Sequence, residues 1–522
     1  MSWPRAESPR DWLLSGAVVR TLDPARPVAG AVLVEDGVIA AVLDDDAAVA
    51  GATRVDLRGR CVLPGFTDAH VHLPTWALTR RELRLEDTRS AAEVARRVEE
   101  AVAAAAPGAW VRGFGWTQEA WADPAPPSRE QLDAVSGDVP VALLAHDWHS
   151  LWVNSAALAR AGGDLEAPGG IVERDAGGAP TGILREAAAW RFRDRHAGAS
   201  PAELRDATRA ALPAVAAEGV TAIHDKDGVV GALEIYEALR DEGALTLRVW
   251  QSLPPERLEG LVEAGVRSGD GDDRLRVGYL KAYLDGTLGS RTARLLDGSG
   301  VAVTRPEAFA DLVARAARAG FPVAVHAIGD RAVRDALDAF EAGAGDWQPR
   351  GLRPRIEHAQ CVSAADLPRF AALGVAASVQ PSMATTDRDV AERLWADRLE
   401  GAYAYHSLHA AGARLAFGSD APVEPLSPLE GIRAAVLRTL DERPPWREHE
   451  AVDAATALAA ATCEPAWLEG AEHRRGRLRP GMAADLVVLS ADPLAGPDAL
   501  AAAEVEATMV GGTWVWDPAR YK

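Results

Sequence analysis

The chain has 522 residues, of which 48% are hydrophobic and 25% charged, so it exceeds one average domain and can bury a large core. Its formal net charge of −20 disfavours a nucleic-acid partner, because binding to polyanions depends on basic surface. No run approaches the length of a membrane span, and the first residues lack the apolar core of a signal peptide, which favours a cytoplasmic location.

The two ends of the chain share a β-type pattern. Short apolar segments at 18–22, 31–34 and 38–42 are separated by Asp-Pro and Asp-Gly turns. Segments of the same type return at 485–489 and 508–516. We therefore expect residues 1–60 and 468–522 to build one small β-sandwich domain together, with a barrel at 61–467 inserted between them.

Two histidines, His70 and His72, end an apolar run. Residues i and i+2 of a β-strand project from the same face, so both imidazoles can reach one metal ion. Taken alone, the pair is explained equally well by chance and by metal binding. Later apolar runs, however, end in four more residues with the chemistry of a two-metal site: Lys281, His326, His358 and Asp420.

Between the two ends, apolar β-type runs alternate with helical stretches rich in Ala, Arg, Glu and Leu, which is typical of parallel β/α architecture. Eight candidate strands end near His70, His224, Ser252, Leu284, His326, His358, Gln380 and Asp420. The predicted fold class is therefore α/β, a (β/α)8 TIM-like barrel. A ninth run at 139–144 is assigned to an insertion after barrel strand 1, at about 76–210, because that interval is too long for one crossover helix.

Lysine is rare in this chain, since its 56 basic residues include only Lys226, Lys281 and Lys522. Arginine supplies positive charge almost everywhere else. A lysine inside the apolar run 275–284 therefore indicates chemistry that a guanidinium cannot perform, because an amine can lose its proton and react. The alternative is a strand-end lysine paired with Asp285.

Eight motifs extend over nearly the whole chain: PGFTDAHVH at 64–72, NSAAL at 154–158, GGIVERDAGGAPTGILRE at 169–186, LKAYLDGTLGSRTA at 280–293, HAIGDRAV at 326–333, RIEHAQ at 355–360, GSDAPVEP at 418–425 and GRLRPGMAADLVVL at 476–489. With these motifs the chain resembles the amidohydrolase-3 group of the amidohydrolase superfamily. One position departs from that group. Trp148 stands where relatives usually have glycine in an Asp-Gly-His-Ser motif, which changes the shape of the local pocket.

The resemblance implies a binuclear centre of two divalent ions, with zinc as the expected metal. The ligands of the first ion would be His70, His72 and Asp420, and those of the second would be His326 and His358. CO2 would carboxylate Lys281, and the resulting carbamate would bridge the two ions. Asp420 would receive a proton from the attacking water and pass it to the leaving nitrogen.

The implied activity is hydrolysis of a non-peptide carbon–nitrogen bond, in an amide or an N-substituted formamide-like compound, by a hydroxide that bridges the metals. Two other classes stay open. One is a hydrolase of the same fold that acts on a lactone, a phosphoester or an exocyclic amine, and the other is a non-catalytic binding or regulatory barrel. The expected partner is a small-molecule substrate, with neither a nucleic acid nor a membrane, and a homodimer is left open.

Several of these residues also have a simpler interpretation. His326 and His358 can each be hydrogen-bonded core histidines, and Asp420 can cap a turn or helix. Asp68 is expected to orient a ligand histidine from outside the ligand set. Asp330 is also expected beside the site, where we favour a helix N-cap over a direct part in catalysis.

The substrate side is less explicit in the sequence. The expected insertion carries seven of the sixteen tryptophans, and we assign most of them to its core. Trp148 and His149 are candidates for substrate binding, because a ring in place of glycine narrows the cavity. His224 ends the second barrel strand and either hydrogen-bonds the substrate or only packs. Arg291 follows the lysine strand and can bind a substrate carboxylate.

Overall fold

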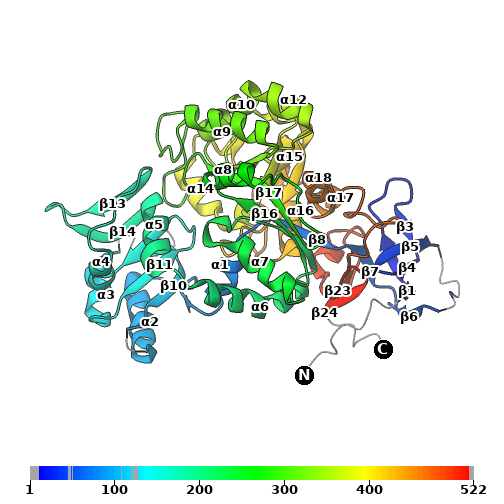
Figure 1. Cartoon of the computed structure of the whole chain (residues 1–522), viewed down its shortest axis with the longest axis horizontal. Helices are drawn as coiled ribbons and strands as arrows, with labels where there is room; N and C mark the ends of the chain where they lie inside the picture. The colour runs from blue at the N-terminus through cyan, green and yellow to red at the C-terminus, as the bar shows by residue number, and fades with distance from the viewer. Residues whose placement is uncertain are drawn as a thin grey trace.

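A computed structural model describes residues 11–516, except 45–48, 50, 107, 119–120 and 123–126. Its centre is an eight-stranded parallel sheet that curls into a nearly closed barrel (Figure 1). The strands are β8 (Phe66–Val71), β15 (Val220–Asp225), β16 (Arg248–Leu253), β17 (Leu275–Tyr283), β18 (Val323–Ala327), β19 (Arg355–His358), β20 (Ala376–Val379) and β21 (Leu415–Phe417). The predicted (β/α)8 fold and its eight strands are confirmed.

Helices alternate with these strands and cover the outside of the barrel (Figure 1). They are α6 (Pro201–Ala217), α7 (Ala232–Asp241), α8 (Leu258–Glu263), α9 (Pro306–Ala319), α10 (Asp330–Ala342), α12 (Leu367–Leu373), α15 (Tyr405–Ala410) and α16 (Pro428–Leu437). Local sequence explains their ends. Before α6, Ser200 and Glu203 bind each other's backbone N–H groups in a capping box. Helix α9 ends at Gly320, whose φ of 85° suits a residue without a Cβ.

Matched register brings the strand ends to one rim of the barrel. Tyr283 on β17 pairs with His326 on β18, and Ala327 pairs with His358 on β19. After β21, the Asp420 N–H donates to the carbonyl oxygen of His70 at 2.7 Å, which ties the last strand to the first. In barrels of this kind the C-terminal rim carries the functional groups.

The two ends of the chain form two further sheets, with orders β5-β4-β1-β6 and β24-β23-β22-β7-β2-β3. Their strands are β1 (Trp12–Ser15), β2 (Val18–Arg20), β3 (Val28–Ala29), β4 (Ala31–Glu35), β5 (Val38–Leu43), β6 (Thr53–Asp56), β7 (Cys61–Pro64), β22 (Leu486–Leu489), β23 (Val505–Val510) and β24 (Thr513–Trp516). Side chains of both sheets share one apolar core, and blue and red strands lie side by side in Figure 1. The predicted sandwich of both termini is confirmed, while its boundaries at 60 and 468 stay a prediction.

One terminal segment differs from its predicted form. The run at 508–516 is not a single strand, because β23 and β24 form an antiparallel hairpin. Gly511 and Gly512 make the turn with φ values of 57° and 75°, which glycine adopts at little cost.

Between β8 and β15, the chain builds a separate six-stranded sheet of order β13-β14-β12-β11-β10-β9. Its elements, with the helices beside it, are α1 (Leu73–Thr79), β9 (Leu83–Arg84), α2 (Ala91–Ala104), β10 (Val111–Trp116), α3 (Arg129–Ser136), β11 (Val141–Ala145), β12 (Ser150–Val153), α4 (Ser155–Ala161), β13 (Gly170–Arg174), β14 (Pro180–Glu186) and α5 (Ala187–Phe192). The ninth apolar run thus becomes β11, outside the barrel sheet. In Figure 1 this insertion lies on the opposite side of the barrel from the terminal sheets.

The remaining α-helices are α11 (Ala344–Trp347), α13 (Met383–Thr386), α14 (Arg388–Leu394), α17 (Ala454–Ala460), α18 (Cys463–Leu468) and α19 (Pro497–Ala502). Within the described ranges, no helix combines the length and apolar character needed to cross a membrane.

Candidate metal centre

The six predicted metal ligands lie at the C-terminal rim of the barrel and line one cavity. His70 ends β8 with His72 just beyond it, Lys281 lies near the end of β17, His326 lies in β18, His358 ends β19, and Asp420 follows β21. These are barrel strands 1, 4, 5, 6 and 8. Residues that are up to 350 positions apart in the sequence are therefore neighbours in the fold.

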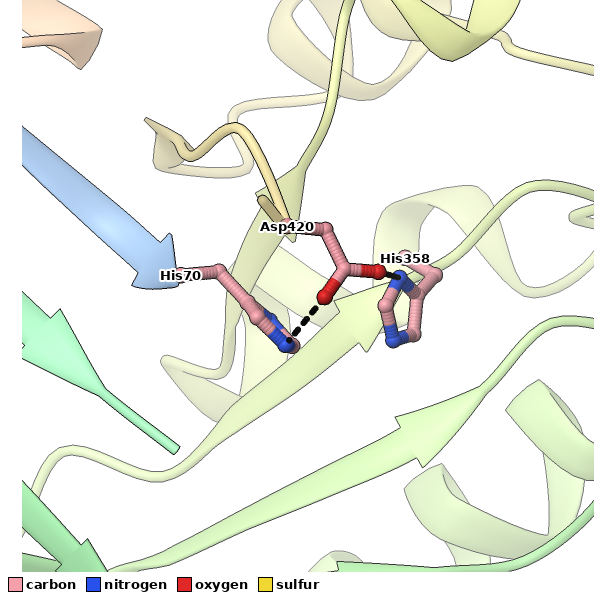
Figure 2. A group of neighbouring side chains, drawn as sticks. All are labelled: His70, His358 and Asp420. Atoms are coloured by element: carbon pink, nitrogen blue, oxygen red, sulfur yellow. Dashed lines mark ion pairs between the residues drawn. The ribbon is translucent and has the colours of Figure 1, made fainter. Parts of the chain in front are cut away.

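Three of these residues bring their donor atoms together. His70, His358 and Asp420 each offer one atom, and the three atoms lie within 4.8 Å of one another. His70 Nε2 is 3.2 Å from Asp420 Oδ1, and His358 Nδ1 is 3.8 Å from Asp420 Oδ2. Figure 2 shows the carboxylate between the two rings, with one oxygen toward each. Among the described residues, no other group of three or more His, Cys, Asp or Glu side chains meets this distance.

His72 and His326 adjoin this group. His72 Nε2 is 3.4 Å from Asp420 Oδ1, the oxygen that also faces His70. The His326 ring packs edge-on against His358, with the centroids 4.4 Å apart. The four histidines and Asp420 thus form one cluster rather than separate core contacts.

The first two histidines are each held at one nitrogen by a carboxylate. His70 Nδ1 is 2.8 Å from Glu357 Oε2, and His72 Nδ1 is 2.8 Å from Asp227 Oδ1. Because a carboxylate can only accept, Nδ1 carries a proton and Nε2 faces Asp420. Metal-binding histidines donate their second N–H in this way. Burial lowers the pKa of His72, but Asp227 and Asp420 outweigh it and raise this pKa to about 10, so the position favours positive charge.

The other two histidines also have one nitrogen held by an acceptor. His358 Nδ1 is 2.8 Å from Gln380 Oε1, and His326 Nε2 is 3.2 Å from the carbonyl oxygen of Gly286. Burial lowers the pKa of His358 to about 3 and that of His326 well below its ordinary value. Both rings are therefore neutral near pH 7, the form in which imidazole binds metals.

Lys281 lies beside the cluster with a buried amine. The residue is 4% exposed, and Nζ has no hydrogen-bond partner among the described residues. Nζ is 3.9 Å from the centroid of the Tyr283 ring. Asp285, the alternative partner, instead accepts hydrogen bonds from three backbone N–H groups. Burial lowers the pKa of Lys281 to about 8, which raises the share of neutral, nucleophilic amine.

The main chain at the cluster is held in unusual conformations. Asp420 has a φ of 58° and His358 a φ of 74°, in a region that residues other than glycine rarely adopt. Asp68 Oδ1 accepts from the backbone N–H of His70 and of Ser419, and Oδ2 accepts from the Ser419 hydroxyl. Asp68 thus acts on His70 through the main chain, whereas Glu357 is the partner of its ring.

A cavity of about 660 Å³ opens over the cluster, within the usual range for small-molecule sites. Trp148, His149 and Arg291 line it. His149 Nδ1 is 2.5 Å from Oε2 of the fully buried Glu186, and the His149 ring centroid is 5.3 Å from that of His326. The insertion therefore supplies part of the cavity wall.

The structure places His224 outside the cavity lining. The residue is fully buried, with Nε2 2.7 Å from Glu469 Oε1 and Nδ1 3.0 Å from an Arg355 nitrogen. Both ring nitrogens already have protein partners. Of the two roles considered for His224, packing therefore fits the structure, and contact with a substrate does not.

The expectation that Asp330 caps a helix is wrong. Gly329 is the N-cap residue of α10, and Asp330 is the first residue of the helix. The Asp330 carboxylate turns instead to the segment after β17, where it accepts from the Leu296 N–H at 2.8 Å, and it also contacts Arg398. It lies outside the cavity lining.

Four residues that accept from histidine rings at the cavity were not predicted from the sequence: Asp227, Glu186, Glu357 and Gln380. The first three stand within or shortly after β15, β14 and β19, and Gln380 follows β20 at a strand end that the sequence did indicate. The position of these residues near strand ends was thus the sequence signal that could have identified them. Which ring each side chain would meet was not visible, because the partners come from different strands.

Replacing Gln380 by leucine should weaken metal binding. The change leaves His358 Nδ1 without its acceptor and permits the tautomer that places the proton on Nε2. Loss of such a partner typically costs 10–100-fold in metal affinity, so we expect about that decrease in a metal titration of the apoprotein. The control is Gln380→Glu, which keeps an acceptor oxygen. Equal affinity in the leucine variant and the parent would contradict this role.

A sequence model of the amidohydrolase family matches residues 53–516. The chain belongs to this family. It is 32% identical to the protein LONG AFTER FAR-RED 3 of Arabidopsis thaliana, over 98% of this chain and 92% of that protein. It is 30% identical to N-substituted formamide deformylase of Arthrobacter pascens, over 93% of this chain and 94% of that protein.

Solved structures agree with this assignment. The crystal structure of an uncharacterized metal-dependent hydrolase from Pyrococcus horikoshii OT3 matches with a TM-score of 0.76 at 28% identity, covering 94% of this chain and 99% of that one. The predicted family, and with it a hydrolase, is confirmed.

Proposed function

We propose that this chain is a metal-dependent amidohydrolase that binds two divalent ions, with zinc as the expected metal, and cleaves a non-peptide carbon–nitrogen bond in an amide or N-substituted formamide-like compound. The observation that carries the proposal is the position of the buried Lys281 amine, which has no hydrogen-bond partner among the described residues, on the same cavity as four histidines and Asp420. The relatives named as a formamide deformylase and a metal-dependent hydrolase support the bond type and the metal.

The donor set fits two such ions. Imidazole nitrogens and carboxylate oxygens are preferred zinc ligands. The ligands of one ion would be His70, His72 and Asp420, and those of the other would be His326 and His358. The neutral Lys281 amine would add to CO2 and release a proton, and the resulting carbamate would provide an anionic oxygen for each ion. This modification would use the amine that has no hydrogen-bond partner among the described residues.

Divalent ions at this position would lower the pKa of a water molecule and polarise the substrate carbonyl. The chain itself moves the proton. Burial opposes ionisation of Asp420, but His70 and His72 outweigh it and hold its pKa well below the ordinary value, so the residue is an anion. In the proposed reaction this anion accepts the proton of the attacking water. The water oxygen bonds to the carbonyl carbon, the C–N bond breaks, and Asp420 returns the proton to the leaving nitrogen. A carboxylate and an amine result.

Trp148, His149 and Arg291 would contact the small-molecule substrate. His149 is oriented by Glu186, so its Nε2 can form a directed hydrogen bond inside the cavity. Arg291 is exposed at the rim, where an acidic group of a substrate can reach it. In this proposal the three residues bind the substrate and take no part in the proton transfer.

The purified protein should contain up to two divalent ions per chain, and His70→Ala should lose metal and activity together. The alanine removes one ligand and leaves the Glu357 carboxylate without its ring partner. Metal analysis of parent and variant checks this, with His146→Ala as the control because His146 lines the same cavity outside the cluster. A fully active protein without metal would contradict the proposal.

The type of bond can be tested separately with a screen of amides, formamides, lactones and phosphoesters. A preference for a C–O or P–O bond would contradict the proposed cleavage of a carbon–nitrogen bond.

A further inference from the structure

Three carboxylates line the cavity without an ion-pair partner among the described residues: Asp147, Asp387 and Glu424. The acidic groups of the metal cluster are different, since Asp227 and Asp420 contact histidines. Two arginines of the cavity wall are also neutralised, Arg185 by Glu173 and Arg193 by Asp194. The cavity thus has uncompensated negative charge in one part of its wall.

Glu424 is the most buried of the three, with 4% of its surface exposed. One carboxylate oxygen, Oε1, accepts from the Thr386 hydroxyl at 2.5 Å, and Oε2 has no hydrogen-bond partner among the described residues. Burial, together with the charge of Asp387, raises the pKa of Glu424 to about 8. Ionisation of Glu424 is therefore unfavourable unless a positively charged group lies beside it.

Asp387 is the neighbour that shares this wall. Its Oδ2 accepts from the Tyr403 hydroxyl at 2.6 Å. Burial and the charge of Asp147 raise the pKa of Asp387 to about 6. The charge of Asp147 therefore acts on Asp387 and that of Asp387 on Glu424, as expected for one continuous acidic surface.

Gln360 provides an independent sign of a ligand at the same wall. It is 5% exposed and lines the cavity, and its Oε1 has no hydrogen-bond partner among the described residues. Its Nε2 donates to the sulfur of Met383 at 3.2 Å. Met383 begins α13, the helix that leads into Asp387, so the carboxamide lies beside the acidic surface. A buried acceptor without a donor normally has a partner that the protein alone does not supply.

The chemistry of this wall favours an organic cation over a metal ion. The three carboxylates are not among the residues whose donor atoms come within 4.8 Å of one another, so they are spread too widely to hold one ion. Val390 and Val423 line the cavity next to them and offer an apolar surface to a hydrocarbon arm. Val423 N–H donates to the Asp420 carbonyl oxygen, which places the wall directly beside the metal centre.

We propose that Glu424, Asp387 and Gln360 form a subsite for a cationic nitrogen group of the substrate, an ammonium or a guanidinium. This inference rests on the proposed function, and the substrate is then an amide whose non-reacting arm ends in such a cation. Charged N–H donors satisfy both the free carboxylate oxygen and the carboxamide oxygen. Arg291, exposed at the rim, can still bind an acidic group without competing for this inner wall.

The subsite can be tested by binding alone, without turnover. Calorimetry on the metal-loaded protein would compare n-butylguanidinium and n-butylammonium with n-butylurea, which has the shape of the guanidinium without its charge. Binding of n-butylguanidinium cannot be explained by coordination to the metals, because a guanidinium keeps its proton and has no lone pair to offer. A charge-assisted contact at a buried site predicts about tenfold or tighter binding of either cation.

Glu424→Gln and Asp387→Asn should reduce this preference, with the larger loss in Glu424→Gln, and leave n-butylurea binding unchanged. Both variants should melt no lower than the parent, because each replaces a buried acidic group whose ionisation is opposed by burial and by its neighbours. The matched control is Glu307→Gln, the same substitution on α9 outside the cavity lining, which should keep the preference.

Equal binding of urea and cations by the parent, tighter binding of pentanoate, or a preference that survives in both variants would overturn the subsite. Its failure can be separated from that of the proposed function. Loss of the cation preference with amides still hydrolysed would remove only the subsite. A cation preference that depends on Glu424, in a protein that hydrolyses no amide, would remove only the proposed reaction.

Discussion

Lys281→Arg is expected to lose metal and activity as completely as Lys281→Ala. The parent amine is buried and has no hydrogen-bond partner in the described part of the chain, and its burial lowers its pKa to about 8. Arginine cannot form a carbamate and would bring its charge against two metal ions. At about 4 Å and an effective dielectric near 20, each contact between unit charges costs roughly 4 kcal/mol, enough to expel a metal.

The measurements are metal content and kcat for the parent and both variants. If the carbamate supplies the bridging oxygens, small carboxylates such as formate or acetate should partly restore metal and activity to Lys281→Ala. They should not do so in Lys281→Arg, where the guanidinium occupies the space. A metal-replete, active Lys281→Arg protein would return Lys281 to the role of a simple cation and remove the bridge from the mechanism.

Asp420→Asn should lower kcat by about 10²-fold or more while the fold and at least one metal are kept. Asparagine has nearly the same shape, and the four proposed histidine ligands His70, His72, His326 and His358 remain. It cannot, however, accept the proton of the attacking water or return it to the leaving nitrogen. The loss should therefore appear in kcat more than in KM.

Asp330→Asn is the matched control, because Asp330 is also a buried aspartate but lies outside the cavity lining. It should keep kcat near that of the parent. Metal analysis of the Asp420 variant separates loss of proton transfer from loss of an ion. Near-normal turnover in metal-loaded Asp420→Asn would exclude Asp420 as the group that moves the proton.

The barrel and its candidate ligands could be predicted from local patterns. Buried parallel strands are continuous apolar runs, and the period of two places His70 and His72 on one face. The scarcity of lysine singled out Lys281 before any contact was known. The strand patterns depend on residues close in the chain, and the scarcity of lysine depends on composition alone. The observed strand ends agree with the strand patterns.

The roles of single polar side chains were less predictable. His224 lies near the end of a barrel strand as the candidate ligands do, yet its ring lies between Glu469 and Arg355. Asp330 lies at the start of a helix, close to where an N-cap would stand, yet its carboxylate accepts from the Leu296 N–H in another loop. Local spacing is the same for a ligand, a cap and a packed residue, and only the neighbours from other strands distinguish them.

The amino-acid sequence by itself determined the order of the strands, the face on which the histidines lie and the residue types that reach the rim of the barrel. The tertiary structure alone decided which atoms meet there. Closing the barrel brings Glu357 to His70 across 287 positions of sequence. The same closure leaves the Lys281 amine buried beside them, with no hydrogen-bond partner in the described part of the chain. It also gathers Glu424, Asp387 and Gln360 from three separate loops into one wall. Strand periodicity is a local property, whereas the partner of a buried charge depends on how distant segments pack.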